Sequence, residues 1–360
     1  MTGQLVCRSC GATYDPGPDE PWRCTCGHPL DFAGPSLPDE PPATLDRSRG
    51  LWAFEDFIGQ DASVTLGEGW TPLVEAPEWN ATVKLEYLFP SGSFKDRGAT
   101  TVLSRARSLG VDRVVEDSSG NAGAAIATYA ARAGIEAEIY VPASAPPSKI
   151  EAIDRVGATP IPVEGDRQAV TEACQAAVER GGAWYASHVW NPAFLAGTQT
   201  FAFEVAAQRA WSAPDAVVLP VGHGTLFLGA YRGFASLADA GWIDEMPRLL
   251  GVQAAGVAPI ADAFHDGRAG ETNDAADGIQ IVDPPRRDQI VSAIETTAGD
   301  AIAVGQAATE AAVGALHRRG LYVEPTSAVA VAGLEAYRER GEVSADADVV
   351  VPLTGSGLKY

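Results

Sequence analysis

The sequence lacks any run of apolar residues long enough to cross a bilayer, although 46% of its 360 residues are hydrophobic. Its first residues, MTGQLVCRSCG, also lack the basic start and apolar stretch that are typical of a secretory signal. Neither a membrane protein nor an exported one is therefore expected. The composition predicts a soluble globular protein of the cytoplasm.

Positive charge is scarce as well. Asp and Glu number 47 against 26 Lys and Arg, which gives a formal net charge of -21. Such a charge repels phosphate backbones and anionic lipids, so neither nucleic acid nor a membrane is expected as a partner. Only four residues are lysines: Lys84, Lys95, Lys149 and Lys359. This bias resembles the acidic proteome of a halophile, and an ordinary acidic enzyme is the alternative.

The chain divides into a short leading unit and a longer α/β body. Residues 1–34 carry four of the five cysteines and are followed by a Pro-rich connector, GPSLPDEPPATL, which cannot form a helix. From residue 112 onward, β-branched runs alternate with Ala-rich helical patterns, which predicts β-α units and a mainly parallel sheet. Strands are predicted over 113–116, 137–141, 160–163, 216–219, 249–253 and 347–351. Helices are predicted over 95–109, 122–133, 148–156, 167–180, 195–210, 226–240, 302–318 and 327–340.

A lysine at the start of a predicted helix is the first candidate for chemistry. In the segment SGSFKDRG, small residues precede Lys95. The N-terminal field of a helix disfavours the ammonium form, so the pKa of Lys95 can be lowered and its amine can act as a Schiff-base nucleophile. From this segment alone, a solvated lysine in a surface turn is an equal alternative.

A turn of small polar residues is the second candidate. The segment DSSGNAG, residues 117–123, leads into an apolar helix and offers hydroxyls and backbone amides at the positive helix end. A carboxylate would bind well there, and ordinary helix capping is the alternative.

A glycine-bearing loop is the third candidate. The segment VGHGTL, residues 221–226, follows an apolar strand, and successive backbone amides in such a loop can hold a phosphate. The turn Gly222-x-Gly224 also admits a remote alternative, an NAD-dependent oxidoreductase. Phe227, however, stands where a dinucleotide fingerprint has its third glycine.

The leading cysteines have the spacing of a metal site. Cys7 and Cys10 form one pair, and Cys24 and Cys26 form a second pair that is one residue shorter. Four thiols in a cytoplasmic protein favour tetrahedral zinc over disulfides, and a closed four-ligand site is structural rather than catalytic. A zinc ribbon over residues 1–34 is therefore predicted, with His28 as a substitute ligand. Cys174, on a predicted helix, is expected in the core.

Together and in this order, the three loops resemble those of the fold-type II pyridoxal-phosphate enzymes, the tryptophan synthase β family, and among these the threonine synthases. Two further matches are EPTSA at residues 324–328 and PLTGSGLK at 352–359. The resemblance spans about residues 65 to 359. It implies an α/β fold with two open, twisted, mainly parallel sheet domains, pyridoxal 5'-phosphate as cofactor, a small amino acid as substrate and a homodimer. A large cofactor-binding domain is expected over 35–97 and 202–360, and a small domain over 98–201.

The resemblance also implies roles for individual residues. Lys95 would hold the cofactor as a Schiff base and then act as general base, while Asn121 would contact the cofactor's phenolic oxygen. Thr354 would face the pyridine nitrogen. The substrate carboxylate would be held by Ser118, Ser119 and Asn121, and the cofactor phosphate by Gly222, His223, Gly224 and Thr225. The histidines without a motif, His188, His265 and His317, are expected to be structural.

The implied activity is that of a threonine synthase-like lyase, which converts O-phosphohomoserine and water to threonine and phosphate. The sequence departs from that pattern at Phe194 and Gln199, where the family usually has Arg and Lys that pair with the substrate phosphate. Losing two charge-assisted contacts weakens binding of a dianion by roughly 1.5 to 3 kcal/mol each. A threonine or serine dehydratase, or a diaminopropionate ammonia-lyase, is therefore the alternative.

Overall fold

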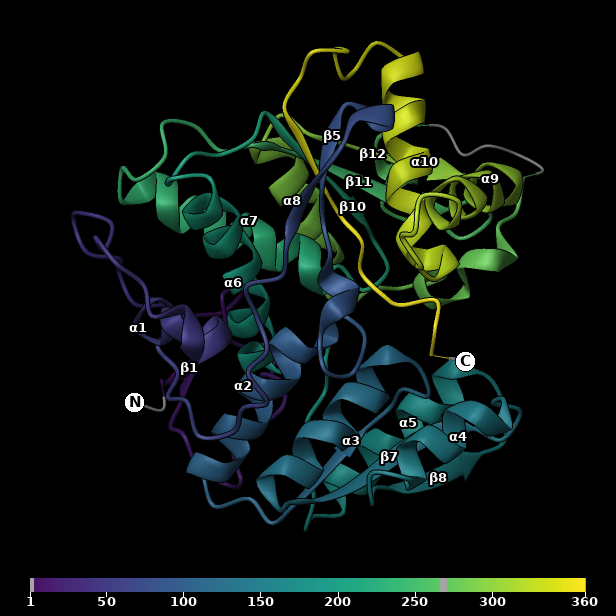
Figure 1. The fold of residues 1–360 in the computed structure, drawn as a ribbon. Helices are drawn as coiled ribbons and strands as arrows, with labels where there is room; N and C mark the ends of the chain where they lie inside the picture. The colour runs from purple at the N-terminus through teal and green to yellow at the C-terminus, as the bar shows by residue number, and fades with distance from the viewer. Residues whose placement is uncertain (1–2, 266–270, 360) are drawn as a thin grey trace.

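The computed structural model of the protein describes residues 3–265 and 271–359. Within these residues the strands form three sheets, of three, six and four strands. Helices cover the two larger sheets, which lie in separate lobes of the molecule (Figure 1). The fold is therefore α/β with mixed sheets. No helix in the two described ranges is long and apolar enough to cross a membrane.

The six-stranded sheet forms the upper lobe in Figure 1 and has the order β12-β11-β10-β13-β5-β4. Five strands are parallel, and β4 pairs antiparallel at one edge. Side chains alternate between two apolar layers, because Val217 packs with one core cluster and Val218 with the other. The strands are β4 (Leu73–Ala76), β5 (Ala81–Lys84), β10 (Ala216–Pro220), β11 (Arg248–Ala254), β12 (Asp300–Val304) and β13 (Val349–Pro352).

The four-stranded sheet forms the lower lobe and is parallel throughout, in the order β8-β7-β6-β9. One face packs against α2 (Lys95–Ser108) and α3 (Asn121–Ala133), and the other packs against α5 (Arg167–Glu179). Cys174 of α5 is fully buried in that second layer, as expected. The strands are β6 (Arg113–Glu116), β7 (Glu136–Pro142), β8 (Thr159–Val163) and β9 (Trp184–Tyr185).

One buried helix joins the lobes. The helix α6 (Pro192–Gln208) is apolar on nearly all sides and packs against α2 and α7, so it belongs to the interior rather than to the surface. The other α-helices are α1 (Glu55–Ile58), α4 (Pro147–Asp154), α7 (Thr225–Asp239), α8 (Arg287–Thr296), α9 (Gln306–His317) and α10 (Pro325–Glu339). Short 3-10 helices are η1 (Arg47–Phe54), η2 (Pro77–Trp79), η3 (Glu86–Leu88), η4 (Ala261–Ala263) and η5 (Asp274–Ile279).

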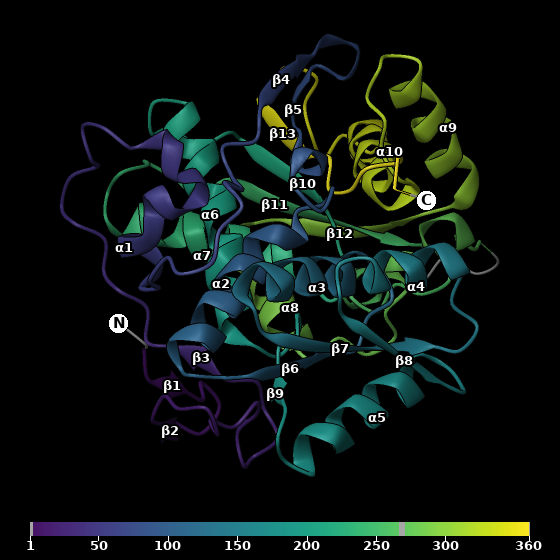
Figure 2. The same ribbon diagram turned by 60° about the horizontal axis from the view of Figure 1, so that its bottom comes forward.

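The amino-terminal unit is a small antiparallel sheet that touches both lobes (Figure 2). Its strands are β1 (Leu5–Val6), β2 (Thr13–Tyr14) and β3 (Asp31–Phe32). The buried carboxylate of Asp31 lies 2.9 Å from Arg232 and 2.9 Å from Arg286, both of the upper lobe. Trp22 packs edge-on against Tyr185 and Trp190 of the lower lobe. The unit is thus held in place by charge and by aromatic packing.

The predicted strands and most of the predicted helices are present within a few residues, with one error. The helix predicted over 302–318 begins only at Gln306, because residues 302–304 belong to strand β12. Asp300-Ala-Ile-Ala-Val is a short Ala-bearing run, and its burial between β11 and the helices makes it a strand. Strands β4, β5 and β9 and helices α1 and α8 were not predicted from the sequence.

Candidate active site

A cavity of about 200 Å³ lies between the two lobes, at the carboxyl ends of β6 and β10. In open α/β sheets, ligands collect at that end of the strands. All three loops that the sequence singled out line this cavity: Lys95 at the start of α2, residues 117–122 after β6, and residues 222–226 after β10. Thr354, which follows β13, lines it too. The candidate residues of the α/β body therefore meet at one place.

Lys95 is half-buried and faces this cavity. Burial lowers the pKa of its amine to about 8, and the carboxylates of Glu116 and Glu324 oppose that shift. Its Nζ lies 4.9 Å from the centre of the Phe94 ring and makes no hydrogen bond or ion pair within the described residues. The lowered pKa agrees with the sequence argument, but burial rather than the helix field is its main cause. A neutral, unpaired amine in a cavity can act as a nucleophile.

The loop of residues 117–123, called the Ser/Asn loop below, supplies short polar side chains to the cavity wall. Ser118, Ser119 and Asn121 all line the cavity. The side-chain Oδ1 of Asn121 accepts a hydrogen bond from Lys359 at 2.7 Å, and its Nδ2 donates to Glu324 at 2.8 Å. These two partners fix the plane of the Asn121 amide.

The loop of residues 221–226, called the glycine loop below, presents backbone N–H groups. Those of residues 222–225 make no hydrogen bond within the described part of the chain, and these residues line the cavity just before α7. Gly224 has a φ of 76°, and a Cβ atom there would lie 2.3 Å from Ile290, so only glycine fits. Unpaired N–H groups at a helix N-terminus suit a phosphate.

Thr354 is held in place by the segment that contains the EPTSA match. Its Oγ1 lies 2.9 Å from Oγ of Ser327, which also accepts the backbone N–H of Gly355 at 2.7 Å. The two carboxyl-terminal motifs of the sequence analysis therefore meet in the structure and place one neutral hydroxyl in the cavity wall.

Sequence reasoning missed His188 in the cavity wall and Glu116 buried behind it. His188 was expected to be structural, yet it lines the cavity, and its Nδ1 lies 2.5 Å from Oε1 of Glu116. Its Nε2 lies 3.3 Å from Nδ1 of His223. Burial raises the pKa of Glu116 to about 8 and lowers the pKa of both histidines well below the usual range. The available signal was a glutamate at the end of an otherwise apolar strand.

Two cationic side chains also line the cavity from the lower lobe. Lys149 comes from α4 and Arg167 from the first position of α5. Neither lies within a motif of the sequence, so pattern reasoning did not find them. They bring positive charge to a site whose other cation, Lys95, has a lowered pKa.

The two positions where the sequence lacks expected basic residues do not line the cavity. Phe194 is fully buried, and its ring would lie 2.3 Å from a Cβ atom placed on Gly98. The same ring packs edge-on against His188, with 6.1 Å between ring centres. Gln199 is likewise absent from the cavity wall. The ring of Phe194 therefore packs against His188 on the side away from the cavity.

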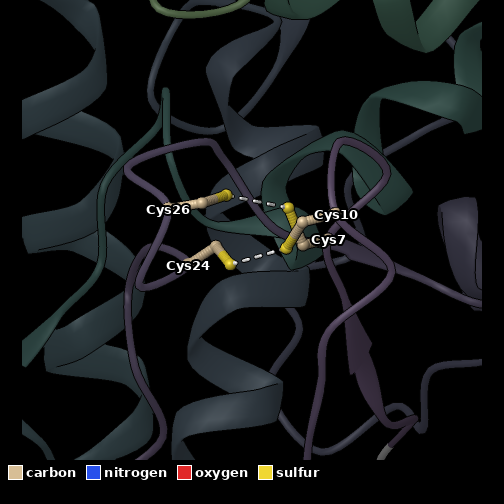
Figure 3. A group of neighbouring side chains, drawn as sticks. All are labelled: Cys7, Cys10, Cys24 and Cys26. Atoms are coloured by element: carbon tan, nitrogen blue, oxygen red, sulfur yellow. Dashed lines mark hydrogen bonds between the residues drawn. The ribbon is translucent and has the colours of Figure 1, made fainter.

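The four leading cysteines lie together in the amino-terminal unit, with Cys7 and Cys24 buried and Cys10 and Cys26 exposed (Figure 3). Their sulfur atoms all lie within 4.8 Å of one another. Sγ of Cys7 is 3.6 Å from Sγ of Cys26, and Sγ of Cys10 is 3.5 Å from Sγ of Cys24. His28 is close by, with its Nδ1 3.4 Å from Sγ of Cys26.

Comparison with known proteins gives one family and one fold. Residues 64–355 match the family model described as "Pyridoxal-phosphate dependent enzyme". The chain is 33% identical to the threonine synthase of Methanocaldococcus jannaschii over 377 residues, covering 98% of this chain and 92% of that protein. It is 34% identical to the threonine synthase of Synechocystis over 334 residues, with coverage of 89% and 85%. Among solved structures, threonine deaminase isoform 2 of Solanum lycopersicum superimposes with a TM-score of 0.71 at 21% identity, covering 91% of this chain and 94% of that one. That likeness concerns the fold alone.

Proposed function

Because the chain is a threonine synthase-like member of the pyridoxal-phosphate dependent enzymes, we propose that it converts O-phosphohomoserine and water to threonine and phosphate. The observation that carries the proposal is the amine of Lys95, unpaired and with a pKa lowered to about 8, in a cavity shared with the three predicted loops.

The residues of the cavity fit the cofactor. Pyridoxal 5'-phosphate needs an amine for its aldehyde and hydrogen-bond donors for its phosphate. Lys95 offers the amine, and the unpaired N–H groups of residues 222–225 offer the donors without any basic side chain. Asn121 would contact the phenolic oxygen, and Thr354 would face the ring nitrogen. When bound, the cofactor withdraws electrons from the substrate's α carbon and so stabilises negative charge there.

Side chains of the protein would bind the substrate and accept its α proton. The carboxylate of the substrate would bind at Ser118, Ser119 and Asn121, where hydroxyls and a helix N-terminus meet. Lys95 would accept the α proton at Nζ, since a pKa of about 8 leaves about a tenth of the amine unprotonated at pH 7, a far larger fraction than in an ordinary lysine. A neutral hydroxyl from Thr354 cannot hold a proton on the ring nitrogen as a carboxylate would, which favours elimination over transamination.

A phosphorylated substrate requires positive charge in the cavity. Phe194 and Gln199 do not supply it. Lys149 and Arg167 line the same cavity, and we assign them to the substrate phosphate in place of the expected pair. Charge-assisted bonds to a phosphate are about twice as strong as neutral ones.

One experiment separates this function from its alternatives. The cofactor-loaded enzyme is incubated separately with O-phosphohomoserine, threonine, serine and diaminopropionate, and phosphate, ammonia and keto acids are measured. Equal amounts of phosphate and threonine from O-phosphohomoserine are expected. Ammonia from threonine, serine or diaminopropionate without phosphate release from O-phosphohomoserine would instead indicate a dehydratase or an ammonia-lyase, which the apolar residue Phe194 favours.

We also propose that Cys7, Cys10, Cys24 and Cys26 hold a structural zinc ion. Four thiolates at about 2.3 Å from a central ion lie about 3.8 Å apart, and the observed sulfur separations of 3.5 and 3.6 Å are near that value. Residues 1–34 would then be a zinc ribbon. Metal analysis of protein purified without chelators should give one zinc per chain.

The domain division of the sequence analysis remains our proposal. Its support is that the six strands of one sheet come from 35–97 and 202–360, whereas the four strands of the other come from 98–201.

The homodimer remains a proposal by analogy with related enzymes. Sedimentation of the cofactor-loaded protein tests it.

A further inference from the structure

Three titratable side chains form a line from the interior of the lower lobe to the cavity. Glu116, at the end of β6, is fully buried. Its Oε1 lies 2.5 Å from Nδ1 of His188, and Nε2 of His188 lies 3.3 Å from Nδ1 of His223. His223 belongs to the glycine loop and lines the cavity, and its Nε2 makes no hydrogen bond within the described residues. The line therefore ends at Nε2 of His223, in the cavity wall.

The line is held rigidly. The backbone N–H of His188 donates to Oε2 of Glu116 at 3.2 Å, which fixes the glutamate from its second oxygen. Phe194 packs against the His188 ring, and His188 itself is 5% exposed. Arg286 donates to the carbonyl of the next residue, Val189, at 3.2 Å. Water has little access to the middle of the line, so its hydrogen bonds are made within the protein.

With both rings neutral, two arrangements of protons satisfy every contact in the line, because a neutral imidazole has one donor and one acceptor nitrogen. In the first, Glu116 is protonated and donates to His188, Nε2–H of His188 donates to His223, and His223 presents Nε2–H to the cavity. In the second, Glu116 is a carboxylate, both histidines carry their proton on Nδ1, and His223 presents a lone pair. Burial keeps both rings neutral, as the lowered pKa values of His188 and His223 indicate.

We propose that Glu116, His188 and His223 form a proton relay that sets whether Nε2 of His223 offers an N–H donor or a lone pair to the phosphate group on residues 222–225. The proposal rests on the proposed function for the identity of that phosphate. In the switch, Nε2 of His223 releases its proton to a water or ligand oxygen, Nε2 of His188 passes its proton to Nδ1 of His223, and Glu116 passes its proton to Nδ1 of His188. One proton leaves the relay, and both rings stay neutral.

The direction of the switch with pH follows from the buried carboxyl group. The pKa of Glu116 is raised to about 8, so the donor arrangement prevails below that pH and the lone-pair arrangement above it. A lone pair beside a phosphate dianion is repulsive, whereas an N–H is attractive. Other charged groups face the relay or share the cavity: Lys95, Asp117, Lys149, Arg167, Asp277 and Glu324. Since Lys95 titrates in the same range, the test must read the histidines directly.

The first test reads the tautomers by nitrogen-15 NMR of the imidazoles in the full chain, which has five histidines. With and without bound pyridoxal phosphate, His188 and His223 should change together from the Nε2–H to the Nδ1–H tautomer as pH rises from about 6.5 to about 9.5. In Glu116→Gln, which cannot release a proton, the joint change should disappear. Asp300→Asn, which alters the separate pair of His265 and Asp300 at 2.7 Å, should leave it intact. Independent titration of the two rings, or a joint change that persists in Glu116→Gln, would overturn the relay.

The second test measures affinity with a ligand that cannot react with Lys95. Pyridoxine 5'-phosphate carries the phosphate but no aldehyde. Its Kd should rise about tenfold more between pH 7 and pH 9.5 in the wild-type chain than in His223→Asn, whose amide keeps an N–H donor at all pH values. His223 is a half-buried loop residue, so His223→Asn is expected to fold. The second test can therefore be made even if Glu116→Gln does not fold. Identical pH profiles in the two proteins would overturn the relay, whereas failure of the proposed function would appear separately, as no reaction of pyridoxal phosphate at Lys95.

Discussion

At the scale of single residues, the proposed reactivity depends on one amine, that of Lys95, whose surroundings differ from those of Lys84. Lys95 has no carboxylate partner within hydrogen-bond reach, while Lys84 is fully buried and lies 3.0 Å from Glu204. Burial therefore accompanies an unpaired amine of lowered pKa at Lys95 and an ion pair at Lys84. The difference lies in the partners and not in the residue type.

The pH dependence of cofactor capture follows from the pKa of Lys95. Only the neutral amine attacks an aldehyde, and burial lowers this pKa to about 8. The rate at which pyridoxal phosphate reacts with the apoprotein should therefore rise with a midpoint near pH 8 and level off above about pH 9, as followed by the absorption of the bound cofactor. Lys95→Ala should show no such band, and Lys149→Ala should still show it. A midpoint near pH 10 would contradict the assigned environment.

A buried ion network that involves Arg97 of α2 should dominate local stability. Arg97 donates to Glu86 at 2.7 Å and to Glu204 at 2.7 Å, and all three side chains are fully buried. Arg97→Met would leave two carboxylates with fewer partners and should lower the free energy of unfolding by about 3 to 5 kcal/mol in urea titrations. Arg107→Met, on the exposed side of the same helix, should change it by about 0.5 kcal/mol or less. Equal effects would show that the network contributes little.

At the scale of elements, the junction of β10 and α7 has a strict steric requirement at Gly224. Gly224→Ala would put a Cβ 2.3 Å from Ile290 in a residue with φ of 76°. Gly241 has a similar φ of 70° but no atom within 4 Å of its Cβ position. Gly241→Ala should therefore cost about 1 kcal/mol, from backbone strain alone. Gly224→Ala should cost clearly more and weaken binding of pyridoxine 5'-phosphate, as measured by thermal unfolding and by titration.

The individual strands and helices also show which parts of the fold could be predicted from the sequence and which could not. Strands such as β10, with an unbroken apolar run, and helices with Ala-rich periodicity, such as α3, were predicted because local pattern and final burial agree. Strand β5 ends in Lys84, whose charge is tolerated only because Glu204 arrives from α6, a contact with no local signal. His188 was set aside for the same reason, since Glu116 and His223 are distant from it in the sequence. The three loops were found because their own composition predicts their chemistry.

At the scale of the whole molecule, the amino-terminal unit should act as a clamp between the lobes. It contacts Arg232 and Arg286 on one side and Tyr185 on the other. Removing its proposed zinc with a chelator, or replacing Cys10 by Ser, should lower the Tm of the full chain, because a metal that binds only the folded state stabilises it. Cys174→Ser, which alters the cysteine outside the cluster, should leave zinc content unchanged. An unchanged Tm on complete loss of zinc would contradict the clamp.

The charge of the whole molecule leads to a separate prediction. With a net charge of -21, self-repulsion destabilises the folded state when few counter-ions are present. Unfolding measured in urea should therefore require more denaturant as sodium chloride rises from about 0.05 to about 1 M, where the Debye length falls from above 10 Å to about 3 Å. A midpoint that does not move would leave the acidic composition without a role in stability.

The cavity is assembled from residues that are made at very different times during synthesis. A growing chain has Lys95 and the Ser/Asn loop early, then the glycine loop, and only near residue 354 the hydroxyl that completes the wall. On a translating ribosome the amine of Lys95 is thus present long before the cavity is complete. If Lys95 holds the cofactor as proposed, its capture in the native position must wait until the last strand, β13, has inserted between β5 and β10.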